Sequence, residues 1–279
     1  MNRRLSVLLH WLHGRRNGVG AGDLLSFLTS PPSGFKARRV ISSMEEQGDV
    51  YKVGLRGIAS RLVWPKSIGL VWLYAIIAEQ CSSKDWHVYE TPETKVRRGD
   101  VVVDCGAAEG LFSLLVADRA ARVHAIEPLP LWVECMRRTF ESLPNVEVLP
   151  CALSNETGTA TLEGNGIRSR LDSEGHFVVP VETIDTLFVK RGIRVDFLKA
   201  DLEGHDLKML QGASETISRY GPRIAITTYH EPSHANAMME LLRTLKPAYR
   251  FVTKGIEAST GAPVMLHAWT EDGHLDSPC

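Results

Sequence analysis

The sequence predicts a doubly wound α/β fold in which a mostly parallel sheet of seven strands is covered by helices. From residue 101 to residue 269, short strand-like runs alternate with helical stretches, an order typical of a parallel sheet with helices on both faces. Continuous apolar runs such as residues 101–103 indicate strands that are buried on both sides. A smaller helical segment precedes this region. We therefore expect residues 1–66 to form an N-terminal segment and residues 67–279 to form the main domain.

The N-terminal segment begins with three short predicted helices. Leucines spaced at i, i+3, i+4 and i+7 from Leu5 share one helical face, and Gly14 can end this first helix. Asp23 can cap a second helix, which Pro31 would end. A third helix is expected over residues 33–48.

Two strand-like runs follow, at residues 50–53 and 60–64, and a glycine-containing turn separates them. Three helices followed by a hairpin are the order of a winged helix. The basic side chains of its third helix would then face DNA, and these are Lys36, Arg38 and Arg39. The alternative is a plain helical cap, or an arm that forms a homodimer. A further helix at residues 68–80 is expected to pack on the main domain.

The strands of the main sheet are expected at seven places, with helices in most of the gaps between them. These places are residues 101–105, 122–126, 146–150, 195–200, 223–229, 249–253 and 264–269. Between the third and fourth strands, residues 159–162 and 177–181 resemble an added antiparallel pair. The polar loop that joins this pair, residues 163–176, is expected to overhang a ligand.

The composition, 44% hydrophobic and 23% charged, is that of a globular enzyme and excludes a disordered or fibrous protein. The longest apolar run, residues 69–78, is about half of the ~20 residues that a membrane span needs, so we expect a cytoplasmic protein with no membrane partner. The five cysteines lack the C-x-x-C spacing of a metal site. We therefore expect reduced thiols and no bound metal.

The clearest motif is VVVDCGAAEG at residues 101–110, a buried strand that runs through a glycine turn into a helix. Gly106 and Gly110 allow a ligand to approach the backbone closely, and the helix N-terminus offers free N–H groups. A dinucleotide motif would need a middle glycine where Ala108 stands, and Asp104 at the strand end repels phosphate. The turn therefore predicts a nucleotide-type ligand that does not present phosphate to it.

S-adenosylmethionine is such a ligand, because it carries an amino group and a sulfonium but no phosphate. The Asp104 carboxylate suits these positive charges. The second strand ends in Glu127, whose carboxylate can accept hydrogen bonds from both ribose hydroxyls. Two acids at adjacent strand ends, with the glycine turn between them, predict S-adenosylmethionine as the cofactor.

Further motifs follow along the chain. They are GDVVVDCGA at residues 99–107, Glu127-Pro128, ALS at residues 152–154, VETIDTL at residues 181–187, and FLKADLEG at residues 197–204 followed by LQGA at residues 210–213. With them, residues 86–269 resemble the FkbM-type methyltransferases. The resemblance implies a class I, Rossmann-like methyltransferase fold. It also implies O-methylation of a hydroxyl on a sugar, polyketide or similar small molecule.

The resemblance also implies roles for individual residues. The methionine end of the cofactor would lie against the glycine turn, the ribose against Glu127 and the adenine against Ala152. The implied cofactor-binding residues are Asp104, Gly106, Ala107, Ala108, Glu109, Gly110, Glu127, Pro128, Ala152 and Asp201. The chain departs from the family at His205-Asp206, where alanine and glutamate are commoner, so the acceptor side is less well defined.

Transfer of a methyl group to a hydroxyl needs a base that removes the hydroxyl proton. The candidate catalytic residues are Asp201, Glu203 and His230, because all lie at or just beyond the carboxyl ends of the fourth and fifth strands, where open α/β sheets bind ligands. Alternatively, Asp201 only orients the cofactor and Glu203 caps the following helix. These three side chains are chemically able to hold a divalent ion, but no spacing demands one.

Residues 230–234, HEPSH, match the H-E-x-x-H motif of zinc proteases, which places both histidines on one face of a helix. Proline is accepted only in the first turn of a helix, so Pro232 leaves His230 before the helix and the strand ahead of it. We therefore expect no zinc site here.

Two other functions remain open because the charge is uneven. Up to Lys66 the chain has 11 Lys and Arg against 4 Asp and Glu, whereas the remainder has 21 against 29. A basic segment suits a nucleic-acid or protein acceptor, or a DNA-binding regulator that senses S-adenosylmethionine. The amino-group methyltransferases place an Asn/Asp-Pro-Pro-Tyr motif after the fourth strand, and this chain has Asp201-Leu-Glu-Gly there. A small-molecule acceptor is therefore the leading hypothesis.

Overall fold

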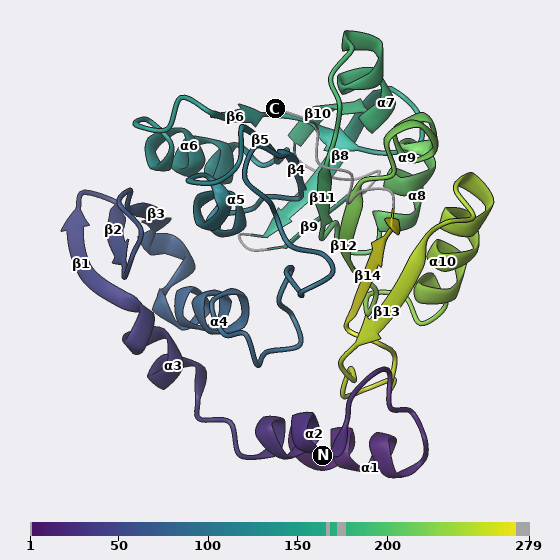
Figure 1. The fold of residues 1–279 in the computed structure, drawn as a ribbon. Helices are drawn as coiled ribbons and strands as arrows, with labels where there is room; N and C mark the ends of the chain where they lie inside the picture. Colours follow the sequence, from purple (N-terminus) through teal and green to yellow (C-terminus); the bar gives the residue numbers. More distant parts are fainter. Residues whose placement is uncertain (1, 166–167, 172–176, 272–279) are drawn as a thin grey trace.

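A seven-stranded sheet forms the centre of the protein in this computed structural model, which describes residues 2–165, 168–171 and 177–271 (Figure 1). The strand order is β13-β14-β12-β11-β4-β5-β6. Its strands are β4 (Val101–Cys105), β5 (Arg122–Ile126), β6 (Val146–Leu149), β11 (Phe197–Ala200), β12 (Arg223–Thr227), β13 (Arg250–Lys254) and β14 (Met265–Trp269). The structure confirms all seven predicted strands, with ends that differ by two residues or fewer.

The last five strands of this order, from β12 to β6, run parallel, and β14 alone runs against its two neighbours. Parallel strands all end at the same edge of a sheet, so the segments that follow β4, β5, β11 and β12 meet there. Neighbouring strand residues point to opposite faces: Val102 packs with Phe112, whereas Val103 packs with Ile217. Both faces of the sheet are therefore buried, as the apolar runs predict.

Helices cover the two faces of the sheet. α5 (Leu111–Val116) and α6 (Pro130–Thr139) lie on one side in Figure 1, and α8 (Asp206–Gln211), α9 (Ser214–Tyr220) and α10 (His234–Leu245) lie on the other. The short α7 (Ile184–Leu187) and a 3-10 turn η2 (Val189–Arg191) precede β11. Local signals set several helix ends, because proline begins α6 and a left-handed Gly221 ends α9.

A second, four-stranded sheet interrupts the chain between β6 and β11. It contains β7 (Ala152–Leu153), β8 (Gly158–Asn165), β9 (Arg168–Leu171) and β10 (Phe177–Glu182), in the order β7-β10-β8-β9. The predicted antiparallel pair corresponds to β8 and β10. The predicted overhanging loop falls partly in β8 and β9, and its residues 166–167 and 172–176 lie outside the described residues.

The N-terminal segment has three helices and a three-stranded antiparallel sheet. They are α1 (Arg3–Leu12), α2 (Ala21–Leu28), α3 (Ser33–Val40), β1 (Ile41–Gln47), β2 (Val50–Leu55) and β3 (Leu62–Pro65), followed by a 3-10 turn η1 (Lys66–Ile68) and by α4 (Leu70–Gln80). The third helix is therefore shorter than predicted. Residues 41–47 form a strand instead, because Met44 and its neighbours pair with β2, and this tertiary pairing overrides the helical pattern.

The three N-terminal helices do not pack together as in a winged helix. Val7 of α1 and Leu24 of α2 belong to a cluster with Trp86 and Ile256, whereas α3 packs on α4. Lys36, one of the three residues expected to face DNA, forms an ion pair with Asp85 at 3.1 Å. The helices thus lie against different parts of the main domain, as Figure 1 shows.

The N-terminal sheet shares a hydrophobic core with the main domain. Trp64 of β3 is fully buried against Trp132 of α6, with ring centroids 5.4 Å apart. The backbone N–H of Val63 also donates to the hydroxyl of Thr139 at 3.0 Å. The division at residue 66 stays a prediction, but the two parts bury each other's side chains. No helix in the described part of the chain is long and apolar enough to cross a membrane.

We predict that Trp64→Ala lowers the free energy of unfolding by about 3–5 kcal/mol, because it leaves a cavity in this shared core. Urea denaturation measures the change. The control is Trp72→Ala, which removes a half-exposed tryptophan of α4 and should change stability by less than about 0.5 kcal/mol. The Trp64 variant could instead unfold in two separate transitions, the one with the larger free energy being the same as in the parent. This result would show that the N-terminal segment is an independent unit.

Candidate active site

A cavity of about 540 Å³ opens where the carboxyl ends of the parallel strands meet. Its floor is formed by the β4–α5 turn and by the segments that follow β5 and β11. Its walls come from α4, from residues 87–89, and from the loop between β13 and β14. Segments far apart in the sequence thus converge on one cavity, at the edge of the sheet where α/β proteins bind ligands.

The turn between β4 and α5 packs tightly against β11. Gly106 has a positive φ of 71°, and a Cβ atom there would lie 2.1 Å from the carbonyl oxygen of Asp201. Ala107, Ala108 and Glu109 line the cavity. Gly110 does not: it adopts a left-handed conformation before α5, and a Cβ atom would overlap Phe140. Gly110 therefore shapes the turn rather than contacting a ligand.

Asp104 is fully buried below the cavity floor. Its carboxylate accepts a hydrogen bond from the hydroxyl of Ser113 at 2.7 Å and forms an ion pair with Lys199 at 2.9 Å. Asp104 is also not among the residues that line the cavity, so its contact with the amino group of a cofactor stays a prediction. The sequence pattern placed Asp104 at the correct strand end, but it did not reveal the buried lysine that uses its charge.

Glu127, Pro128 and Ala152, which the sequence predicts to bind the cofactor, all line the cavity. The two carboxylate oxygens of Glu127 accept hydrogen bonds from the backbone N–H groups of Ala108 at 3.1 Å and of Leu129 at 2.9 Å. These bonds fix the orientation of the carboxylate and leave further lone pairs free. Burial raises the pKa of Glu127 to about 7.

Glu109 is a second buried acid that faces the cavity. The side-chain amide of Gln80, from α4, donates to it at 3.3 Å. Burial raises the pKa of Glu109 to about 7. The cavity therefore holds two carboxyl groups that are close to half ionised at neutral pH, and a bound cation would favour their ionised forms.

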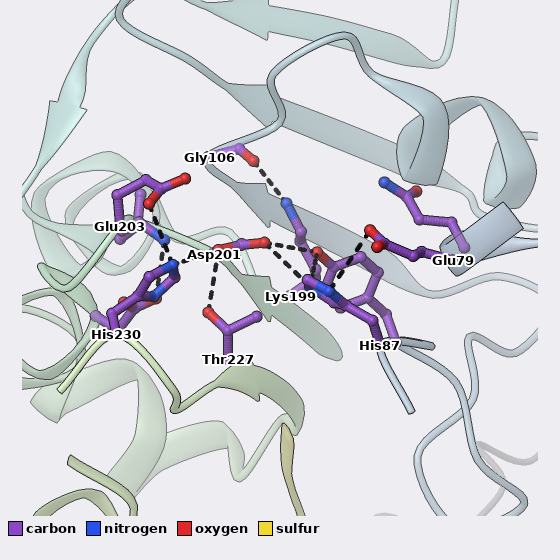
Figure 2. Close-up of polar contacts among 12 residues, drawn as sticks. Glu79, His87, Gly106, Lys199, Asp201, Glu203, Thr227 and His230 are labelled. Atoms are coloured by element: carbon purple, nitrogen blue, oxygen red, sulfur yellow. Dashed lines mark hydrogen bonds and ion pairs between the residues drawn. The ribbon is translucent and has the colours of Figure 1, made fainter. Parts of the chain in front are cut away.

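Asp201 is the centre of the polar network in Figure 2. Its carboxylate accepts hydrogen bonds from the hydroxyls of Tyr89 at 2.9 Å and Thr227 at 3.1 Å, and it lies 3.3 Å from Nε2 of His87. Burial alone would raise the pKa of Asp201, but the hydrogen bond and charge of His87, with the charge of Lys199, hold it well below its usual range. Asp201 therefore stays ionised and is a poor acceptor of protons.

Lys199 is a site residue that the sequence analysis did not select. Its ammonium group is buried between Asp104 and the cavity, and it donates to the carbonyl oxygen of Gly106 at 2.6 Å. Burial would lower the pKa of Lys199, but the charges of Asp104 and Asp201 raise it. A lysine within the otherwise apolar run of residues 197–200 is a signal that could have identified it.

His87 is the second missed residue, and it lines the cavity beside Asp201. Its other ring nitrogen, Nδ1, lies 3.9 Å from the carboxylate of Glu79 on α4. Burial would lower the pKa of His87, but the hydrogen bond and charge of Asp201 and the charge of Glu79 raise it. His87 lies in an irregular stretch between α4 and β4, where no periodic pattern marks it.

Glu203 lines the cavity, whereas His230 is not among the lining residues. In Figure 2 His230 lies beside Glu203 and Asp201, with Nε2 3.2 Å from Glu203 and 3.8 Å from Asp201. α10 begins at His234, so His230 precedes the helix, as Pro232 predicts. Across the described residues, no group of His, Cys, Asp or Glu side chains is arranged to hold a metal ion.

Comparison with known proteins gives one family and several structural neighbours. A crystal structure of Methyltransferase FkbM from Methylobacillus flagellatus KT matches 91% of this chain with 17% identity and a TM-score of 0.51. The chain spans 62% of the length of that protein. An rRNA methylase from Streptococcus thermophilus matches 63% of this chain and 89% of its own, with 15% identity and a TM-score of 0.41.

A Streptococcus mutans protein described as a methyltransferase, solved in complex with SAH, matches 63% of this chain and 90% of its own, with 12% identity and a TM-score of 0.42. A comparison with curated proteins finds no significant match. The Methylobacillus structure and this chain share the class I methyltransferase fold, with its seven-stranded sheet. The family model described as Methyltransferase FkbM domain matches residues 104–251, more than half of the chain, and the chain therefore belongs to the FkbM methyltransferase family.

Proposed function

We propose that this protein is an S-adenosylmethionine-dependent methyltransferase that methylates a hydroxyl group of a small molecule. The observation that carries the proposal is the carboxylate of Glu127, which two backbone N–H groups orient at the cavity wall at the end of β5. S-adenosylmethionine, when bound, supplies an electrophilic methyl group on a sulfonium. The membership of the FkbM family supports this chemistry.

The residues present fit the cofactor. The free lone pairs of Glu127 suit two ribose hydroxyls. Next to it, Trp132, Ala152 and Leu153 give the cavity an apolar wall, which suits a purine ring. At the other end, Glu109 and the ionised Asp201 suit the positive charges of the methionine portion. Asp104 contributes indirectly, because it holds Lys199 in place.

Of the described side chains, His87 is the best placed to accept the proton of an acceptor hydroxyl. It lines the cavity and its pKa is raised, which makes the neutral imidazole a stronger base. Asp201, which the sequence analysis grouped with the candidate bases, would hold the imidazolium that forms. Glu203 faces the same space but contacts His230, so we assign both of them to positioning.

A small acceptor fits better than a nucleic acid. The cavity is walled by α4, by Leu162 of β8 and by the β13–β14 loop, and its volume of about 540 Å³ is typical of a small-molecule site. The basic helix that would contact DNA has Lys36 already paired with Asp85. Incubation of a whole-cell extract with the protein and methyl-labelled S-adenosylmethionine, followed by mass spectrometry of its metabolite, RNA and protein fractions, tests the proposal. Label found only in RNA or protein would contradict it.

The first prediction of this function concerns Glu127. Glu127→Ala should weaken S-adenosylmethionine binding by about 1–3 kcal/mol, because two buried hydroxyls lose a charged acceptor. Calorimetry measures the affinity. The control is Glu147→Ala, which removes a half-exposed acid of the neighbouring strand β6 outside the cavity and should leave the affinity unchanged. Equal affinity of the Glu127 variant and the parent would remove Glu127 from the site.

The second prediction concerns pH. Because the pKa values of Glu109 and Glu127 are about 7, both groups are largely protonated at pH 6 and ionised at pH 8. A cationic cofactor prefers the ionised forms, so its affinity should rise with pH across this range and binding near pH 6.5 should release protons. Calorimetry in two buffers of different ionisation enthalpy counts these protons. The Glu109→Gln variant should release fewer protons when the cofactor binds. Proton uptake by the parent protein on binding would contradict the assignment of these two acids to the cofactor site.

The third prediction separates the two histidines. With an acceptor found in the extract assay, His87→Ala should lower turnover by ~10²–10⁴ and leave cofactor affinity nearly unchanged. His230→Ala changes a residue that does not line the cavity, and it should lower turnover much less. Turnover of the parent should rise as the pH increases through the raised pKa of His87. If His230→Ala loses as much turnover as His87→Ala, the proton acceptor is not His87 alone and the assignment fails.

A further inference from the structure

The N-terminal helices carry most of the exposed apolar surface. Among the described residues, seven of the ten large hydrophobic side chains that are exposed belong to α1, α2, α3 and α4. On α1 these are Leu5, Leu9 and Leu12, which follow one another at i, i+4 and i+7 and so form a single stripe along the helix. Leu12 is the most exposed of the three, at 61%. Exposed apolar surfaces of this kind mark sites that bind a protein, a ligand or a membrane.

The stripe is not needed for the fold, because α1 packs through another face. Val7 is fully buried and belongs to the cluster that contains Leu24, Trp86 and Ile256. Further contacts hold the α1–α2 connection on the β13–β14 loop, where the side-chain amide of Asn17 donates to the carbonyl oxygen of Gly261 at 3.0 Å. α1 is therefore firmly attached to the main domain and presents its leucine stripe outward.

The N-terminal segment that carries the stripe is rich in basic residues. Residues 1–40 contain seven Lys and Arg and one acid, Asp23; the seven are Arg3, Arg4, Arg15, Arg16, Lys36, Arg38 and Arg39. On α3 the guanidinium of Arg39 stacks over the ring of Phe35, which is itself exposed. An apolar helix face with basic flanks is complementary to the surface of a membrane that contains anionic lipids.

The same region borders the entrance of the cavity. Arg3 of α1 and Trp72 of α4 both line the cavity, and the neighbouring Val71 is 80% exposed. A half-exposed tryptophan is favoured at the boundary between lipid and water. Figure 1 shows α1 and α2 at the bottom of the view, with α3 and α4 above them.

We propose that the leucine stripe of α1, with the exposed Leu25 of α2 and the exposed Val71 and Trp72 of α4, docks the protein on an anionic lipid bilayer. The proposal does not depend on which molecule is methylated. A second copy of this chain is a poorer occupant, because it would bring two sets of these arginines together. The longest apolar run, residues 69–78, is too short to span a membrane, but a helix that lies on the membrane surface needs no spanning segment. Docking would place the cavity entrance next to molecules held in the bilayer.

The test is sedimentation of the full chain with two kinds of vesicle, phosphatidylcholine alone and phosphatidylcholine mixed with phosphatidylglycerol. We expect binding to the mixed vesicles, weakened by salt, and little binding to the neutral ones. Leu5→Glu with Leu12→Glu should lower the partition coefficient at least about tenfold, because charged side chains replace the apolar stripe. The matched control is Val178→Glu, which changes an exposed valine of β10, and it should bind like the parent.

Thermal melting and S-adenosylmethionine binding show whether each variant is folded, so a loss of vesicle binding in a folded variant supports the proposal. Three results would overturn it. The first is no binding of the parent to mixed vesicles at low salt, and the second is an equal loss of binding in the Val178 variant. The third is a dimer, detected by light scattering without lipid, that Leu5→Glu with Leu12→Glu dissociates; the stripe would then be covered by a second copy.

Discussion

The candidate active site depends on one buried ammonium group, that of Lys199. Burying a charge is costly unless it is paired and hydrogen-bonded, and Lys199 satisfies this requirement through the Asp104 carboxylate and the carbonyl oxygen of Gly106. Because these partners lie on β4 and in the turn that follows it, the lysine ties the end of β11 to the end of β4. The positions of the glycine turn and of Asp201 are thereby fixed relative to each other before any ligand binds.

This ion pair also sets the charges around it. Lys199 and His87 keep Asp201 ionised, whereas Glu109 and Glu127, which lack such a close cation, have pKa values raised by burial to about 7. One permanent negative charge and two acids that a bound cation can ionise therefore face the same cavity. This arrangement suits a positively charged cofactor. It also explains why the most acidic group of the site positions other groups instead of accepting protons.

The sequence predicted the fold of the main domain well, because its strands have local signals that their surroundings reinforce. Apolar runs, glycine turns and alternating helices identified all seven strands. The third N-terminal helix was predicted too long, since residues 41–47 pair with β2, and pairing between strands is a tertiary interaction that no local pattern contains. For the same reason the order of three helices and a hairpin suggested a winged helix, although α1 and α2 pack on the β13–β14 loop.

For the site, the sequence alone determined the residues that follow strand ends: the glycine turn, Glu127, Ala152 and Asp201 all lie where parallel strands finish, and the fold brings such positions together. Only the tertiary structure decided which of these side chains face the cavity. In the structure Asp104 contacts Lys199, and His230 contacts Glu203 without lining the cavity. His87, which belongs to an irregular segment, lies 3.3 Å from Asp201. The physical reason is that a strand end specifies an edge of the sheet, whereas the direction and charge of a side chain depend on neighbours that are distant in the sequence.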